Sequence, residues 1–85
     1  MANEEGQLVG RVTHYYGKAG VAIVELSAGV SAGDLLHYKG KVTDFEEPAA
    51  SIQMEHENIE KAKKGDVVGV KVSQEVREGD EVYKK

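Results

Sequence analysis

The sequence predicts an all-β fold: a small closed barrel of six antiparallel strands with Greek-key connections and at most one short helical turn. Short runs rich in β-branched and aromatic residues recur along the chain, separated by glycine-containing turns. The dipeptide Gly-Asp precedes three of these runs, at residues 33–34, 65–66 and 79–80. Closure into a barrel is favoured because an open sheet of this size would expose the unpaired backbone of its edge strands.

The three Gly-Asp dipeptides are interpreted as turns rather than as ligand-binding loops. Glycine takes the positive φ angles that other residues resist, and a short aspartate side chain accepts hydrogen bonds from nearby backbone N–H groups. We therefore expect Gly65, and at least one of Gly33 and Gly79, to have a positive φ angle. Each turn then directs the chain into a strand.

The first two predicted strands, residues 8–16 and 21–26, form a hairpin around the glycine-bracketed turn 17–20. Gly10, in the middle of the first strand, predicts a bend or a close approach of another backbone. Regular alternation places neighbouring residues of this strand on opposite faces, with Leu8, Gly10 and Val12 on one face and Val9, Arg11, Thr13 and Tyr15 on the other.

The later strands are expected after a loop of small residues, at 35–38, 42–45, 49–56, 67–72 and 82–83. Pro48 places its part of the chain at a sheet edge or a bulge, because proline cannot donate a ladder hydrogen bond. Residues 57–64 are the one stretch with a helical pattern, with Asn58 as a cap. Alternation turns two sets of side chains inward, namely Ala50, Ile52 and Met54, and Val68, Val70 and Val72.

Length and composition restrict the possibilities further. The 85 residues allow one domain, expected over 8–85 after a flexible lead-in over 1–7. The chain has no cysteine, so its stability must come from packing. A net charge of −4 disfavours generic nucleic-acid binding. Without a signal-like start or an apolar run of about 18 residues, we expect a cytoplasmic protein that has no membrane partner.

A series of short motifs extends from residue 9 to residue 83: Val9-Gly10-Arg11-Val12, Gly20-Val21-Ala22-Ile23-Val24, Gly33-Asp34, Ser51-Ile52-Gln53-Met54 with Ile59 and Ala62, Gly65-Asp66-Val67-Val68-Gly69-Val70, and Gly79-Asp80-Glu81-Val82-Tyr83. In order and spacing this series resembles the second-domain β-barrel of translational GTPases of the elongation factor Tu type. It is similar as well to the C-terminal barrel of the collagenase-like peptidases, some of which modify RNA.

The resemblance implies a non-catalytic binding module with a protein or ribonucleoprotein partner in a translation- or RNA-related assembly. The alternative is a free-standing accessory subunit of a collagenase-like peptidase or an RNA-modifying enzyme. Nucleotide binding is not expected, because a phosphate-binding loop needs Ser or Thr after Gly-Lys. In this chain Gly-Lys occurs at 17–18 and 40–41, and neither is followed by Ser or Thr.

No pattern of catalytic or metal-binding residues stands out. The three histidines, His14, His37 and His56, lie in separate strand regions without the close spacing of a metal site, so neither a metal nor another cofactor is expected. The serines lack the motif of an activated nucleophile. We therefore do not expect an enzyme.

The residues with the best prospects for binding lie in the first hairpin: Arg11, Tyr15, Tyr16 and Lys18. Because neighbouring strand residues face opposite ways, at least one of the two tyrosines must lie outside the core. An exposed tyrosine beside a cation is suited to stacking on a base or anchoring a protein partner. Its alternative role is to cover the end of the barrel. The basic run Lys61, Lys63 and Lys64 is the second candidate.

Overall fold

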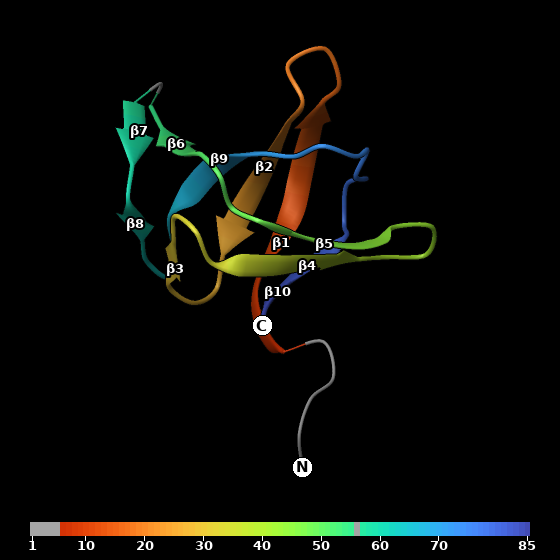
Figure 1. Ribbon diagram of the computed structural model, residues 1–85, viewed down its shortest axis with the longest axis horizontal. Helices are drawn as coiled ribbons and strands as arrows, with labels where there is room; N and C mark the ends of the chain where they lie inside the picture. The colour runs from red at the N-terminus through yellow and green to blue at the C-terminus, as the bar shows by residue number, and fades with distance from the viewer. Residues whose placement is uncertain (1–5, 56) are drawn as a thin grey trace.

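The computed structural model describes residues 6–55 and 57–85, and this part of the chain contains ten β-strands joined by turns and loops (Figure 1). No helix occurs in these residues, so none that could cross a membrane is found there. The predicted all-β class is confirmed. The strands are β1 (Gln7–Tyr16), β2 (Val21–Leu26), β3 (Val30–Ser31), β4 (Leu35–Lys39), β5 (Asp44–Pro48), β6 (Ile52–Met54), β7 (Glu57–Ile59), β8 (Lys61–Ala62), β9 (Val67–Lys71) and β10 (Glu81–Lys84).

Eight strands form one antiparallel sheet in the order β5-β4-β10-β1-β2-β9-β6-β7, and β3 pairs with β8 separately. The large sheet curls around one core as a half-barrel (Figure 1). The prediction of a closed six-stranded barrel is therefore wrong: the sheet has eight strands, and β5 and β7 end it without pairing with each other in the described residues. A side-chain contact joins edge strand β5 to the segment after β9, where the Glu47 carboxylate accepts hydrogen bonds from Ser73 N–H at 2.8 Å and Ser73 Oγ at 2.7 Å.

The inner face of the sheet carries the core. Val68, Val70 and Val72 are 2%, 1% and 6% exposed, so their predicted inward orientation is confirmed. Tyr38 on β4 is fully buried, and its ring stacks on Phe45 of β5 at a centroid distance of 4.9 Å. A valine-rich interior of this kind follows from period-two alternation, which sends every second side chain to the same face.

Strand β1 departs from that alternation at two bulges. Its register shifts between Leu8 and Gly10 against β10, and between Val12 and His14 against β2. Each bulge adds one residue to β1 and so moves the following side chains to the other face. As a result Val9 and Val12 are both buried and Tyr15 packs against the same core. The predicted opposite faces for Val9 and Val12 are corrected accordingly.

The three Gly-Asp turns share one geometry, and the predicted positive φ angles are confirmed: Gly33 and Gly65 have φ of 93° and Gly79 has φ of 92°. In each turn the aspartate N–H donates to the carbonyl oxygen three residues earlier at 3.0 Å. The N–H of that earlier residue donates back to the aspartate carboxylate at 2.8–3.0 Å. These reciprocal bonds link Ser31 to Asp34, Lys63 to Asp66, and Arg77 to Asp80.

Each turn is also fastened to one buried residue elsewhere in the chain. The glycine N–H donates to that residue's carbonyl oxygen, and the residue's own N–H donates to the aspartate carbonyl oxygen, at distances of 2.7–2.9 Å. The buried residues are Ala49 for Gly33-Asp34, Leu26 for Gly65-Asp66, and Val12 for Gly79-Asp80. The turns therefore connect distant strands as well as reversing the chain.

Residues 42–62 differ most from the prediction. Pro48 does lie on an edge strand, β5, as expected. However, the expected strand 49–56 is reduced to β6, with Ala49 rather than Ala50 buried. The expected helical turn over 57–64 is wrong, since β7 pairs with β6 and β8 pairs with β3. Pairing partners distant in sequence override a weak local helical pattern here. His56 lies outside the described residues.

Candidate functional site

A row of exposed residues crosses the outer face of the sheet, with one residue from each of six strands. The strand registers pair neighbouring members of the row directly. In spatial order the row is Asp44, Lys39, Glu81, Arg11, Glu25 and Val67. The sign of the charge alternates along the first five positions. With strands about 4.8 Å apart, the row is about 24 Å long.

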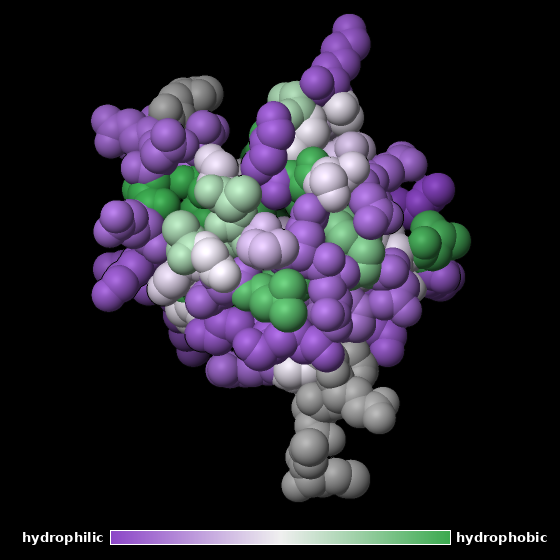
Figure 2. All heavy atoms as spheres, viewed as in Figure 1, coloured by the Kyte–Doolittle hydropathy of each residue, from purple (hydrophilic) through white to green (hydrophobic). Residues whose placement is uncertain are grey.

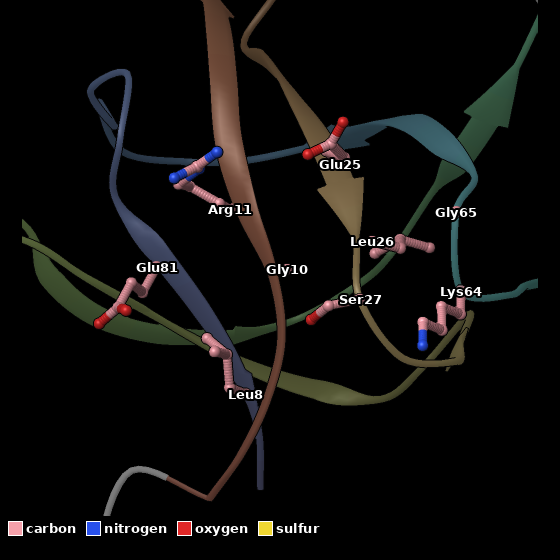
Figure 3. A pocket seen from close by; sticks show the side chains of 9 residues that line it. All are labelled: Leu8, Gly10, Arg11, Glu25, Leu26, Ser27, Lys64, Gly65 and Glu81. Carbon is pink, nitrogen blue, oxygen red and sulfur yellow. The ribbon is translucent and has the colours of Figure 1, made fainter.

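One hollow lies over β10, β1 and β2, beside the turn before β9 (Figure 3). Its volume is about 390 Å³. Gly10 and the buried Leu26 line it, and so does Leu8, which is 43% exposed. Charged side chains of both signs stand around it, from Arg11, Glu25, Lys64 and Glu81. The hollow thus combines an apolar centre with a mixed-charge border.

A second hollow of about 550 Å³ lies between the β4–β5 turn and the Gly79-Asp80 turn. Asp80 is only 5% exposed, and its carboxylate already accepts a hydrogen bond from Arg77 N–H at 2.8 Å. The remaining charged side chains carry both signs, with more positive than negative ones. They are Arg11, Lys39, Lys41 and Arg77 against Glu78 and Glu81.

Arg11 and Glu81 line both hollows, which makes them parts of one depression along the charged row. We call the residues lining the two hollows the Arg11 groove. Two Gly-Asp turns border it, since Gly65 lines one hollow and Gly79 lines the other. The groove is therefore built on sheet and on hydrogen-bonded turns.

The four predicted binding residues do not form one patch. Tyr15 packs against the core at the end of the sheet, as the alternative reading of the tyrosines proposed. Tyr16 is 53% exposed, and its ring lies against His14 at a centroid distance of 4.4 Å. Lys18 is exposed in the hairpin turn, which projects from the body of the fold (Figure 1). Arg11 lies five residues before Tyr16, about 16 Å away along the strand.

Arg11 is flanked by carboxylates on both sides of its strand, since it pairs with Glu81 of β10 and Glu25 of β2. Opposite charges directly across a ladder favour each other. Sequence inspection pointed to Arg11 but missed Glu25, Glu81 and Lys39, because only the strand register brings them into one row. Lys64 of the second candidate run also lines the groove, whereas Lys63 closes the Gly65-Asp66 turn through its backbone N–H.

A polar cluster that shares Asp44 with the row surrounds His37 on the outer face of β4. His37 is only 8% exposed, and its Nε2 lies 2.6 Å from Asp44 Oδ1. The hydrogen bond with His37 lowers the pKa of the Asp44 carboxyl below its usual value. Glu46 Oε2 lies 3.9 Å from His37 Nδ1 and 3.0 Å from Lys85 Nζ. Within residues 6–55 and 57–85, no three His, Asp or Glu side chains converge as a metal site would require.

The surface around these features is mainly hydrophilic, with small separate apolar patches on the face shown in Figure 2. The apolar side chains most exposed are Val42 at 70%, Tyr16 at 53% and Val67 at 50%. Val42 lies in the β4–β5 turn and Tyr16 at the end of β1, whereas Val67 ends the charged row beside Glu25. Of these three, Val67 is the one that continues the row beside the groove.

Two solved structures have the same fold as this chain. The C-terminal domain of a putative U32 peptidase from Geobacillus thermoleovorans superimposes with a TM-score of 0.86 at 19% identity, covering 100% of this chain and 99% of that chain. A selenomethionine variant of that domain gives 0.85 at 20% identity, covering 91% and 98%. The chain thus has an all-β fold like that of the C-terminal domain of a U32 peptidase.

One sequence relative of the chain is also a peptidase. The chain is 46% identical over 76 residues to the uncharacterized protease MJ0090 of Methanocaldococcus jannaschii. The match covers 88% of this chain but only 19% of that protein, so the chain spans about a fifth of its relative's length. No family model matches the sequence. The predicted resemblance to the collagenase-like peptidase barrel is supported by both the fold and the relative.

Proposed function

We propose that this chain is a non-catalytic binding domain that acts together with a collagenase-like peptidase. The observation that carries the proposal is the 46% identity to a segment amounting to 19% of a protease, MJ0090. Most of that protease therefore lies outside the matched part, and this chain, which matches it, has a fold like that of a U32 peptidase C-terminal domain. In this proposal the chain supplies a binding surface to such a peptidase, in the cytoplasm.

The hydrogen bonding of the described residues supports a non-catalytic role. A serine nucleophile is activated by an adjacent general base, most often a histidine. Here Ser73 Oγ donates to Glu47 at 2.7 Å, and Ser51 Oγ donates to Asn58 at 3.4 Å. The two described histidines contact carboxylates instead: His14 contacts Glu78 at 3.3 Å and His37 contacts Asp44 at 2.6 Å. In these contacts the described histidines face carboxylates rather than serines, which supports a binding role.

A second candidate function is binding to an RNA or a ribonucleoprotein, as in the translation-type Greek-key barrels. The feature that favours it is the exposed ring of Tyr16, which lies against His14. His14 in turn contacts Glu78, which lines the second hollow, where cations outnumber carboxylates. Base stacking on such rings contributes to single-strand binding. The net charge of −4 and the carboxylates within the row oppose it, so we rank it second.

The test uses MJ0090 from which the 76-residue matching segment has been deleted. We expect this truncated protease to bind the chain in isothermal titration calorimetry and to coelute with it in size-exclusion chromatography. Full-length MJ0090 is the matched control, and it should bind much more weakly because its own segment occupies the position. Single-stranded oligouridine tests the second function. Equal or absent binding to both forms of MJ0090 would contradict the proposal, and tight binding to the RNA would favour the second candidate.

A further inference from the structure

We propose that the Arg11 groove is the surface by which this domain docks on a polypeptide partner whose face presents charges of both signs around an apolar side chain. The inference rests on the proposed function, in which that partner is a collagenase-like peptidase. It goes further by assigning the contact to a particular face of the sheet and by stating the chemistry that the partner must present.

The alternating charges select the kind of partner. Of the five charged positions in the row, Asp44, Glu81 and Glu25 are acidic and only Lys39 and Arg11 are basic. The groove as a whole carries both signs, with the cations Arg11, Lys39, Lys41, Lys64 and Arg77 against the carboxylates Glu25, Glu78, Asp80 and Glu81, so a nucleic acid laid in it would meet carboxylates between its attractive contacts. A protein face carrying cations opposite the carboxylates and anions opposite Arg11 and Lys39 would meet attraction at every position. Complementary charges of this kind determine partner choice and register more than raw affinity.

The apolar centre of the first hollow gives the partner an anchor point. Leu8 is 43% exposed and stands at one side of the hollow, and Leu26 lies beneath it (Figure 3). At about 390 Å³ the hollow has room for an apolar side chain of a partner. Side chains seated in a central pocket and surrounded by polar contacts are the usual centres of protein interfaces.

The rigidity of the groove supports docking without rearrangement. Its sides come from paired strands, and the Gly65 turn is bonded to Leu26 while the Gly79 turn is bonded to Val12. A surface already ordered in the free protein loses less conformational entropy on binding. The β1–β2 turn with Lys18 projects from the body instead and lies outside the groove (Figure 1). Arg11 and Lys18 can therefore be compared as two exposed cations at different positions.

The first experiment compares R11E with K18E, each of which lowers the net charge of −4 by two. The probe is MJ0090 lacking the matching segment, and affinities are measured by titration calorimetry. We expect R11E to weaken binding about tenfold or more, because a third carboxylate then stands between Glu81 and Glu25. K18E should change the affinity less than about twofold. R11Q provides a milder groove variant in case R11E does not fold, and circular dichroism checks each variant.

The second experiment tests the apolar anchor with L8S and the matched control L35S, whose wild-type residues are 43% and 38% exposed. We expect L8S to weaken binding about tenfold, whereas L35S, outside the groove, leaves it unchanged. If the wild type binds and both R11Q and L8S bind equally well, the docking surface is elsewhere and only this inference fails. If the wild type does not bind at all, the proposed function fails and this inference falls with it. If oligouridine binds and R11Q abolishes that binding, the groove is a nucleic-acid site and the inference is likewise overturned.

Discussion

The middle of β1 and the turn before β9 both depend on a glycine, but for different reasons. At Gly65 the φ angle is 93° and a Cβ would meet nothing within 4 Å, so only the backbone conformation requires glycine. At Gly10 the φ angle is not positive, but an ideal Cβ would lie 2.7 Å from the Glu25 carbonyl oxygen and 2.8 Å from Val24 Cγ1. The first requirement is local and the second comes from the neighbouring strand. The local one can be read from a dipeptide. At Gly10 the sequence predicts a close approach, and the fold shows that Glu25 and Val24 make it.

The largest effect is expected from G10A. The added methyl group meets backbone as well as the Val24 side chain, and a backbone oxygen cannot move aside without distorting β2. We expect a loss of about 3 kcal/mol in the free energy of unfolding. Urea denaturation followed by circular dichroism measures it. A loss below about 1 kcal/mol would show that β1 and β2 separate easily.

The next largest loss of stability is expected at the aspartate of one turn, Asp80, compared with the aspartate of another, Asp66. Asp80 is 5% exposed and Asp66 is partly exposed, although both carboxylates accept the same kind of backbone hydrogen bond. We expect D80A to lower stability by about 2 kcal/mol, because Arg77 N–H loses its acceptor at a site with little water. D66A should lower it by about 0.5 kcal/mol, since water can replace the carboxylate there. Similar losses in the two denaturation curves would refute the role of burial.

G65A tests the purely local requirement. With open space around the Cβ, the strain of a positive φ is the only penalty, about 1 kcal/mol. G33A and G79A, at turns of the same geometry, should lose similar amounts. Thermal melts of the three variants against G10A give the ranking. If any of them were as harmful as G10A, the turns would have a steric role that their open surroundings do not suggest.

A smaller effect concerns acid stability at Asp44. The hydrogen bond with His37 lowers the pKa of this carboxyl from 3.8, so the folded state favours the ionised form. A lowered folded-state pKa contributes stability above the unfolded value, and that contribution is lost as the pH falls below about 3.8. We expect the difference in melting temperature between wild type and D44N to shrink below pH 4. A difference that stayed constant from pH 6 to pH 2.5 would contradict this.

The smallest effect at neutral pH is expected from Y38F. The hydroxyl of Tyr38 is buried and has no hydrogen-bond partner within the described residues, so its removal should leave stability within about 1 kcal/mol or raise it. Burial, together with the nearby charge of Glu47, raises the pKa of Tyr38 far above 10.0. Its contribution to stability is therefore complete below pH 10 and is lost above it, when the unfolded chain ionises. Wild type should weaken relative to Y38F between pH 10 and pH 11 in denaturant titrations.

Prediction from the sequence worked where a short segment carried its own requirement. The Gly-Asp turns, the edge position of Pro48 and the inward valines of β9 follow from the conformational range of single residues or from simple alternation. It failed over residues 57–64, where Asn58, Ile59 and Ala62 suited a helical turn. These residues form strands that pair with β6 and β3 instead. The sequence of the segment does not indicate which strands it will pair with.

The candidate site shows the same division. Arg11 was recognisable as a cation in a strand, and Tyr16 as one of two tyrosines of which at least one had to be exposed. The groove, however, depends on Glu25, Glu81 and Arg11 standing in register across three strands. Two bulges in β1 set that register, and a shift of one residue would move Arg11 to the core face. Regular alternation does not reveal a bulge, and Gly10 predicted only a bend or a close approach near the first of the two.

By itself the sequence determined the all-β class, the first hairpin and the three Gly-Asp turns, because glycine, aspartate and β-branched residues restrict the backbone within a few positions. The tertiary structure alone decided the eight-stranded order, the strands over residues 57–62 and the charged row through Arg11. Hydrogen-bonded strand pairing joins residues far apart in the chain, and the choice among partners depends on the whole core rather than on any one segment.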